Sequence, residues 1–572
     1  MGMTTVFVAT LLAGTSILAV APAYAAPQGS GEAAAGDTPK KHHYHAATGS
    51  DRLDLLEHQL ELQSEAIKQQ AAEIQALKAE LTPAMAAVTP QQFAALQNKV
   101  DAQTAATKDQ ATVTFKQGPT PYLHEKTQPT ITSVDGKWTF APYAMVQGDF
   151  ASYSKGQPLS VAGTDNLKSS GENFRRARIG FNGTFDKDFG YSFIYDFGGS
   201  NGDETYQGYA AANSGSTKNA SGNNITPYTA STGAGTGPHI YNAWVSYKGF
   251  LDPFTLKIGV MSPPANLSDT TQSDDILFNE RPSPAQLSRA LDADEGRESA
   301  GFVGNGSYWN ASLFLTGDTY GKAALVAPAT TYGGSQEAVV SRLAFLPWQD
   351  PASNFNIHLG GNFSYVIHPQ ESTSTANPGV TTYGITFSDR PELRVDNVTF
   401  LNTGAINATS AYTAGLEVAA SYGPFLIQGE DFWYGIERNN PAAGVTDPNF
   451  SGWYVEGSWM LTGEEHRYNI ANASFVRPSP DEPFDPGAGD WGAWEIAGRY
   501  SNTDLDYDVT SKTAADRVFG GVQYIASAGL NFYPNDVLRF VLDWQSVRLK
   551  NIGALGDNGN YSTISFRTQI SF

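Results

Sequence analysis

Residues 174–197 read FRRARIGFNGTFDKDFGYSFIYDF, and this stretch decides the fold. Arg176 and Arg178 share one parity with polar neighbours, whereas the apolar side chains of residues 177–185 occupy the other parity. After the turn at residues 186–190, aromatic side chains again occupy every second position. Period-two alternation predicts two β-strands, each with one polar and one apolar face. Both soluble β-sandwiches and membrane β-barrels contain such strands, and the rest of the chain distinguishes between them.

The composition excludes several classes of protein. The chain has 572 residues and no cysteine, so neither disulfides nor thiolate metal sites are expected. Lys and Arg number 36 and Asp and Glu number 57, so the net charge is 36 − 57 = −21, which disfavours a nucleic-acid partner. The 57 Gly, 27 Tyr and 31 Phe are typical of a glycine- and aromatic-rich β protein. No run of about 18 apolar residues follows the N-terminus, so helical membrane spans are not expected.

Both ends of the chain indicate export to a bacterial outer membrane. Residues 1–25 are apolar and end in Ala23-Tyr24-Ala25, a pattern that predicts a secretory signal peptide, with an N-terminal anchor helix as the alternative. The last ten residues, TISFRTQISF, alternate in polarity and end in Phe572. An exported chain with such an end resembles the barrels that assemble in bacterial outer membranes. A sandwich that finishes on a strand is the alternative.

The part of the chain before the barrel is expected to hold two linkers and a coiled coil. Residues 26–50 form a flexible linker, in which Lys40–His45 is a solvated basic patch or, alternatively, a transition-metal site. Residues 51–82 repeat Leu and Ile in heptads. A narrow apolar seam needs partner helices, so it predicts a short periplasmic α-helical coiled coil; a single amphipathic helix on the barrel is the alternative. Residues 83–136 form a second linker before the barrel at residues 137–572.

The pattern from Trp138 onward predicts an all-β fold, a transmembrane antiparallel β-barrel. Sixteen strand-sized alternating segments follow one another, an even number as in bacterial barrels. With Phe572 at the periplasmic side, the short connections fall on the periplasmic side and the long ones outside. A hairpin at residues 383–400 would raise the number to eighteen. The sixteen segments are residues 138–152, 174–185, 190–199, 239–249, 254–262, 299–306, 308–316, 336–346, 355–366, 414–423, 425–435, 452–462, 491–502, 518–532, 537–547 and 563–572.

Several segments are similar to one known family. They are Phe174–Asp196, Tyr247–Phe250 followed by Phe254–Ser262, Arg390–Asp396, Trp453–Val455 with Leu461–Glu464, and Trp491–Ser501. In their order and spacing they resemble the phosphate-selective porin O/P family of Gram-negative outer membranes, over about residues 137–572. The resemblance implies a sixteen-stranded trimeric barrel that passes anions. It also implies that the heptad segment is a trimeric stalk, because several members carry a short coiled coil before the barrel.

The polar parity of the strands is expected to line the lumen, because lipid requires the apolar parity outward. Arg176 and Arg178 form the best fragment of an arginine ladder, and guanidinium groups bind phosphate oxygens bidentately. Arg178 lies opposite Asp196 on the next strand, so a wall-stabilising ion pair is the alternative. Arg175 has outward parity and is expected at the extracellular rim. The pore-lining candidates are Arg176, Arg178, Lys248, Lys257, Arg342, Arg499, Arg539 and Arg567, and the inward acids are Asp149, Asp196, Glu417, Glu430, Glu456, Glu495 and Asp543.

The segment 263–298 is the counterpart of the family's third extracellular loop, which the resemblance implies folds into the pore. It holds three Arg and eight Asp or Glu, so its net charge is 3 − 8 = −5. An acidic constriction repels phosphate at short range unless its carboxylates pair with arginines or bind a cation. The constriction-loop candidates are Asp274, Asp275, Glu280, Arg281, Arg289 and Arg297.

These observations predict an outer-membrane porin, a water-filled channel for passive diffusion of small anions that are phosphate-like by family resemblance. Two alternatives remain: a general or sugar-permeable pore with weak selectivity, and a structural protein that tethers the envelope through its coiled coil. The expected partners are two further copies of the chain in a homotrimer, outer-membrane lipid, and small anionic or neutral solutes. No Ser/His/Asp arrangement stands out, so neither an enzyme nor a cofactor is expected.

Overall fold

The computed structural model describes residues 128–155, 169–198, 239–319, 336–373, 381–552 except 397, and 557–572, together with residue 167 and short strands at 112–116, 160–161, 164–165, 217–218 and 224–225. The expected signal peptide, first linker and coiled coil lie outside the described residues, as do most of the second linker and most of loop 200–238. No helix within these ranges is long and apolar enough to cross a membrane.

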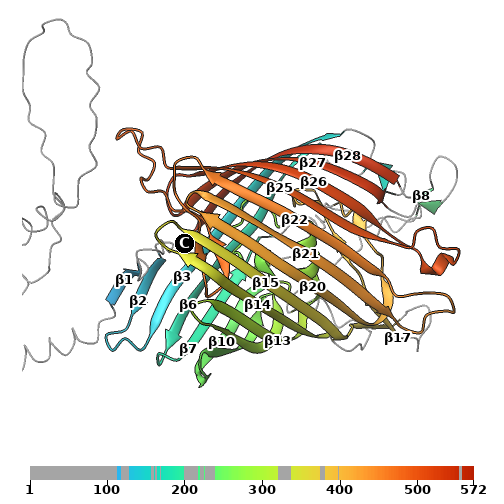
Figure 1. Ribbon diagram of the computed structural model, residues 1–572, viewed down its shortest axis with the longest axis horizontal. Coiled ribbons are helices and arrows are strands. Elements are labelled where there is room, and N and C mark those ends of the chain that lie inside the picture. Colours follow the sequence, from blue (N-terminus) through green and yellow to red (C-terminus); the bar gives the residue numbers. More distant parts are fainter. Residues whose placement is uncertain are drawn as a thin grey trace, which may run out of the picture. The chain divides into compact units, whose positions relative to one another are not determined.

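Sixteen strands within the described ranges form one closed antiparallel barrel (Figure 1). Each strand pairs with the next barrel strand along the chain, and the last, β28, closes the barrel on the first, β3. Each of the sixteen segments expected from the sequence holds one of them. They are β3 (Thr139–Lys155), β6 (Ser170–Phe185), β7 (Phe189–Asp196), β10 (His239–Leu251), β11 (Phe254–Met261), β12 (Arg297–Asn305), β13 (Trp309–Thr319), β14 (Glu337–Asp350), β15 (Phe355–His368), β20 (Ile406–Tyr422), β21 (Phe425–Arg438), β22 (Asn449–Met460), β25 (Ala493–Tyr507), β26 (Val518–Tyr533), β27 (Leu538–Ile552) and β28 (Asp557–Ser571).

A few short strands extend the sheet of the barrel or lie in the connections between its strands. β2 (Gln128–Thr132) pairs with the start of β3, and β1 (Thr112–Lys116) pairs with β2, so the sheet continues beside the end of the barrel where Phe572 lies (Figure 1). The remaining small elements in the connections are β4 (Ser160–Val161), β5 (Thr164–Asp165), β8 (Thr217–Lys218), β9 (Asn224–Ile225) and the 3₁₀ helix η1 (Ala514–Asp516).

The side chains of each barrel strand alternate between the outer surface and the lumen. In β20, Leu416 and Val418 are 58% and 55% exposed, whereas Glu417 between them is 1% exposed. Lipid offers no hydrogen-bond partners, so closure of the sheet satisfies the backbone and the apolar parity covers the outside. The parity assigned from the sequence is confirmed for every inward acid, because all seven are buried.

Placing a charge on the outer face tests this arrangement. Leu416→Arg is expected to destabilise the barrel by about 2–4 kcal/mol, because the residue lies mid-strand in the lipid-facing band. Tyr422→Arg, at the end of the same strand, is the control and is expected to cost at most about 1 kcal/mol. Urea unfolding of the lipid-reconstituted barrel measures both free energies. Equal costs at the two positions would contradict a lipid-facing band at Leu416.

The segment 383–400 does not add a hairpin to the barrel, so the number of strands is sixteen and not eighteen. β16 (Glu371–Thr373) and β17 (Thr381–Ile385) pair with each other, and β17 joins the extracellular end of β20. β18 (Ser388–Asp389) and β19 (Leu401–Asn402) then flank a loop that enters the lumen. Its Leu393 and Val395 are buried against wall residues such as Ile525 and Val547. Apolar packing inside the barrel therefore takes the place of pairing in its wall.

The connection between β22 and β25, residues 461–492, contradicts the expectation that every long connection lies outside. It leaves β22 at the end where Phe572 lies, and its hairpin of β23 (Arg467–Asn469) and β24 (Ser474–Val476) folds into the barrel. Inward side chains bind the backbone of this hairpin. Asn310 donates to the Ala471 carbonyl at 2.8 Å, and Arg342 donates to the Asn472 and Ala473 carbonyls at 2.9 Å each. Hydrogen bonds from polar wall residues thus hold this hairpin of the periplasmic connection inside the barrel.

Candidate functional site

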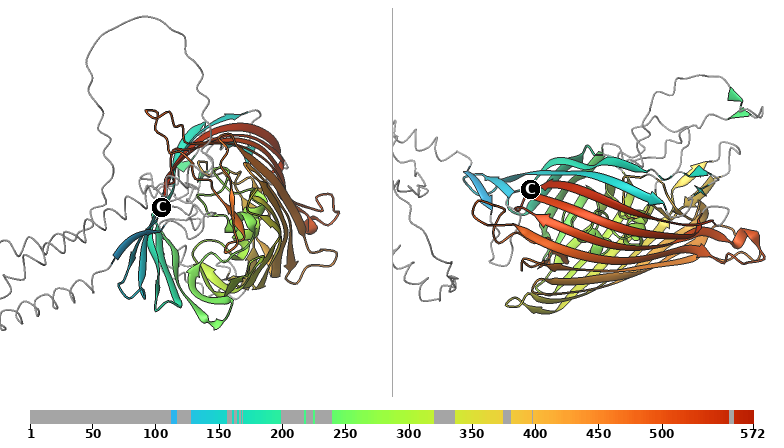
Figure 2. Two further views of the ribbon diagram at one scale, coloured as in Figure 1. Left: turned by 60° about the vertical axis from the view of Figure 1, so that its left-hand side comes forward. Right: turned by 90° about the horizontal axis from the view of Figure 1, so that it is seen from above.

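Residues 263–298, here called the constriction loop, fold into the lumen as expected (Figure 2). The loop carries two helices, α4 (Leu267–Thr270) and α5 (Ser283–Asp292), and almost all of its side chains are buried or half-buried. Two amides at the start of α4, those of Leu267 and Ser268, donate to the inward carboxylate of Glu430 at 3.0 and 2.9 Å. An acid from the wall therefore satisfies amide groups that a short helix leaves open.

Three arginines of the opposite wall hold the backbone of the constriction loop. Arg539 donates to the carbonyls of Asp274, Ile276 and Leu277 at 3.2, 2.8 and 3.0 Å. Arg567 donates to the Asn279 carbonyl at 2.5 Å, and Arg499 donates to the Glu280 carbonyl at 2.9 Å. These predicted pore-lining residues anchor the loop, because each satisfies carbonyl groups that would otherwise be buried without partners.

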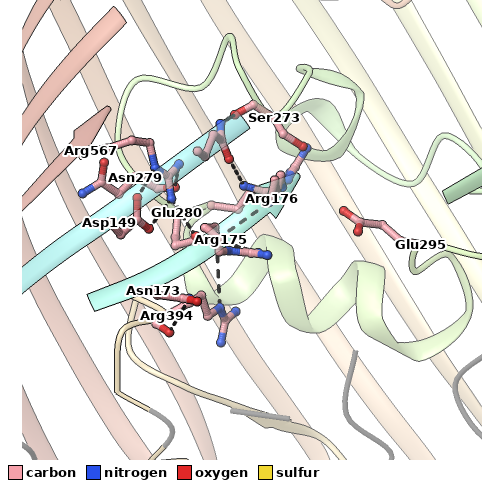
Figure 3. Close-up of polar contacts among 12 residues, drawn as sticks. Asp149, Asn173, Arg175, Arg176, Ser273, Asn279, Glu280, Glu295, Arg394 and Arg567 are labelled. Carbon is pink, nitrogen blue, oxygen red and sulfur yellow. Dashed lines mark hydrogen bonds and ion pairs between the residues drawn. The ribbon is translucent and has the colours of Figure 1, made fainter. Parts of the chain in front are cut away.

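Glu280 lies among four arginine side chains, which we call the guanidinium cluster: Arg175, Arg176, Arg394 and Arg567 (Figure 3). Its carboxylate accepts from Arg175 at 2.6 and 3.1 Å and from Arg567 at 3.1 Å. Arg176 and Arg394 each lie 4.0 Å away. Burial alone would raise the pKa of Glu280, but the guanidiniums of Arg175, Arg176 and Arg567 hold it well below its usual range. The carboxylate is therefore ionised and occupies a place suited to an oxyanion.

The cluster keeps a small excess of positive charge. Arg567 also binds Asp149 at 2.6 and 2.7 Å, and Arg394 binds Asp389 at 2.8 Å. Four arginines therefore face three carboxylates, which gives 4 − 3 = +1. Because the site is buried, solvent screens this excess less than it screens a surface charge.

Arg175 does not point outward as its parity predicted. In the pairing of β3 with β6, Gln147 faces Arg176 but the next residue, Gly148, faces Phe174. The extra residue, Arg175, forms a β-bulge that turns its side chain into the lumen, toward Glu280. An arginine at lipid parity beside an inward arginine was the sequence signal that could have indicated this bulge.

The two predicted ladder residues have different surroundings. Arg176 is 1% exposed and donates to the side chain of Gln147 at 2.8 Å, and its Nε has no hydrogen-bond partner among the described residues. Arg178 binds Asp196 at 2.7 Å and Glu295 of the constriction loop at 2.8 Å. The alternative of a wall-stabilising ion pair is therefore realised at Arg178, and Arg176 is the less compensated of the two.

Comparison with known proteins places this barrel in a family. The family model of phosphate-selective porins O and P matches residues 140–572. The chain belongs to that family. It is 25% identical to Porin O of Pseudomonas aeruginosa over 411 residues, which cover 70% of this chain and 81% of that protein. The protein is a porin of the outer membrane.

Two solved outer-membrane proteins are similar to this porin at low sequence identity. The anion-selective porin from Comamonas acidovorans is 11% identical, with a TM-score of 0.41, and the match covers 76% of this chain and all of the other. The trimer form of OmpT from Vibrio cholerae is 10% identical, with a TM-score of 0.40, and the match again covers 76% of this chain and all of the other.

The remaining wall candidates of this porin lie in three settings. Arg342 binds Glu417 at 2.8 Å besides the inward hairpin. Lys257 is half-buried, with its Nζ 4.0 Å from the ring centre of Trp244. Lys248 is exposed beside the periplasmic turn, because an irregularity in the pairing of β10 with β11 follows Tyr247. An exposed side chain near the periplasmic end is compatible with the pore lining, so this role of Lys248 stays a prediction.

The acids of the constriction loop are largely neutralised by arginines of the same chain. Arg289 binds Asp269 and Asp294 at 2.5 and 2.6 Å. Asp275 lies 3.8 Å from Arg477 of the inward periplasmic connection. Glu280 and Glu295 also bind arginines of the wall, so the loop's net charge of −5 does not describe the field inside the porin. Three further candidates make contacts with backbone carbonyls. Arg281 binds the carbonyls of Ser268 and Thr271 within the loop, and Arg297 binds the carbonyl of Gly317 in β13. Asp274 accepts through its own carbonyl from Arg539 and Gln569.

Two functional side chains come from the second inward loop, between β18 and β19, to which no role was assigned from the sequence. Arg394 completes the guanidinium cluster. Glu392 accepts from the Ser283 amide at 2.9 Å and pairs with Arg499 at 2.5 Å, so it links both inward loops to the wall. A dense run of charges in an extracellular loop, Arg390–Asp396, was the available signal.

Proposed function

We propose that this porin passes small oxyanions of the phosphate class, and that these anions contact the guanidinium cluster at the narrowest point of the channel. The observation that carries the proposal is Glu280, whose carboxylate is bound by Arg175 and Arg567 with Arg176 and Arg394 close by. Guanidinium forks match the oxygens of carboxylate and phosphate alike. A permeating oxyanion would exchange with this carboxylate for the same donors.

We further propose that the porin is a homotrimer with outer-membrane lipid around it, and that residues 1–25 are removed as a signal peptide. The heptads of residues 51–82 support a trimeric stalk, because their narrow seam requires partner helices. The two linkers, residues 26–50 and 83–136, then connect the signal peptide, the stalk and the barrel at residues 137–572.

The selectivity of single channels tests the proposed function. Under a potassium chloride gradient in a planar bilayer, the wild-type channel is expected to show an anion-selective zero-current potential. Arg176→Gln is expected to lower the chloride-to-potassium permeability ratio about fivefold, which corresponds to about 1 kcal/mol, because the least compensated arginine of the cluster is lost.

Lys248→Gln is the matched control, since it removes one positive charge at the exposed periplasmic end. Arg178 is not suitable for this test, because its loss would leave Asp196 and Glu295 buried without their partner. A cation-selective wild-type channel, or equal effects of the two substitutions, would overturn the proposal.

A further inference from the structure

A cavity of about 770 Å³ lies between the constriction loop and the end of the barrel at Phe572. We call it the periplasmic vestibule. Strands β3, β6, β7 and β10–β13 supply its wall, together with the inward hairpin of β23 and β24, and the constriction loop supplies its roof. Its volume falls in the range of about 300–1,000 Å³ that small-molecule sites in proteins occupy.

Aromatic rings form much of the vestibule wall, and a cationic side chain lies over the face of two of these rings. Tyr143, Tyr241 and Trp244 are half-buried and line the cavity. The guanidinium of Arg178 lies 3.6 Å from the ring centre of Tyr241, and the ammonium of Lys257 lies 4.0 Å from that of Trp244. Such contacts are cation–π interactions, which hold a cation beside an apolar surface.

Lys257 differs from the paired cations that line the vestibule. The charged lining side chains are Arg178, Lys257, Arg281, Arg289, Asp269, Asp274 and Asp275. Arg178 and Arg289 have carboxylate partners, at Asp196 and Asp269 among others. Lys257 has no ion pair with any described residue. Its ammonium group lies over the face of the Trp244 ring.

We propose that the periplasmic vestibule binds organic anions, in which a carboxylate or phosphate group is attached to an aromatic or aliphatic body. Lys257 attracts the anionic group, and Trp244 with the neighbouring tyrosines stacks against the body. This proposal rests on the proposed function, since it concerns anions that permeate this channel, and it extends the substrate class beyond inorganic oxyanions. An inorganic anion has no apolar surface to bury against these rings, so the vestibule favours the organic solute.

The experiment compares two carboxylates of equal charge, benzoate and acetate, as blockers of chloride current through the full-length channel in a planar bilayer. Added to the periplasmic side, benzoate is expected to block at a concentration about tenfold lower than acetate, because its ring is buried. Trp244→Ala is expected to abolish this difference, and Trp244→Phe is expected to retain most of it. Lys257→Gln is expected to weaken block by both acids.

Trp453→Ala is the matched control, because this tryptophan is 41% exposed on the outer face of β22. Equal block by benzoate and acetate in the wild type would overturn the proposal, and so would a tenfold difference that survives Trp244→Ala. The zero-current potential of the same channels separates the two ideas. Anion selectivity with equal block overturns only the vestibule proposal, whereas cation selectivity overturns the proposed function itself.

Discussion

Glu280→Gln is expected to lower the phosphate concentration that half-blocks chloride current by about tenfold, which corresponds to about 1.4 kcal/mol. The carboxylate now neutralises part of the guanidinium cluster, and its removal raises the local charge from +1 to +2. Two unit charges 4 Å apart attract each other by about 4 kcal/mol at an effective dielectric constant of 20. Desolvation of the phosphate offsets part of this attraction. The expected tenfold gain in phosphate affinity is therefore smaller than the full attraction would give.

The same substitution is expected to make the porin's stability depend on phosphate. Removing one partner of a buried ion pair costs about 3–5 kcal/mol, because the remaining charges stay buried without compensation. A bound phosphate can supply that compensation, and a ligand that binds only the folded state stabilises it by RT ln(1 + [L]/Kd), which keeps growing with ligand concentration. Thermal unfolding with and without phosphate measures this, and the variant is expected to gain more from phosphate than the wild type.

Glu298→Gln is the matched control for both measurements. Glu298 belongs to the same loop, but it is exposed and does not contact the cluster. Phosphate could block the Glu280→Gln channel as it blocks the wild type and add no stability to the variant. That result would rule out the carboxylate as a competitor of the permeating anion.

Arg539→Leu is expected to release the constriction loop and raise single-channel conductance several-fold. Arg539 is 1% exposed and donates to three loop carbonyls, those of Asp274, Ile276 and Leu277. Each buried carbonyl left without a donor costs about 1–3 kcal/mol. The loop is then expected to leave this part of the wall, where water satisfies its carbonyls, and the lumen widens. Single-channel recording measures conductance, and limited proteolysis measures access to residues 274–279.

Arg517→Leu serves as the control, because Arg517 likewise donates to a carbonyl, that of Ser511, but in an extracellular connection far from the constriction loop in the chain. Its conductance is expected to equal that of the wild type. If Arg539→Leu channels assemble and conduct as the wild type does, the remaining anchors at Arg499 and Arg567 are sufficient to hold the loop.

The number of inward arginines does not measure the anion affinity of this porin. Arg342 and Arg178 are paired with wall carboxylates, and Arg539 is engaged by loop carbonyls. In contrast, Arg176 and Lys257 carry charge that no close carboxylate among the described residues cancels fully. Selectivity is therefore expected to depend on these few positions, which an inventory of inward bases could not separate from the rest.

The sequence by itself determined the barrel. Alternation from residue 174 onward assigns each side chain to lipid or lumen, because the pleat of a strand has a period of two and lipid accepts only the apolar parity. It also located all sixteen strands, because their positions follow from one rule applied along each strand. The inward course of the loop 263–298 was expected from the family resemblance and not from this rule.

Only the tertiary structure decided what the inward charges do. A single bulge turned Arg175 from lipid to lumen, and two segments distant in sequence, the connections 386–405 and 461–492, entered the barrel and changed its interior. Ion pairing depends on distances of a few ångströms between residues up to hundreds of positions apart, as for Arg567 and Asp149. Parity along one strand carries no such information. The stretch that defines the fold thus holds Arg175, Arg176 and Arg178, but closure of the barrel and the loops inside it gave each arginine a different role.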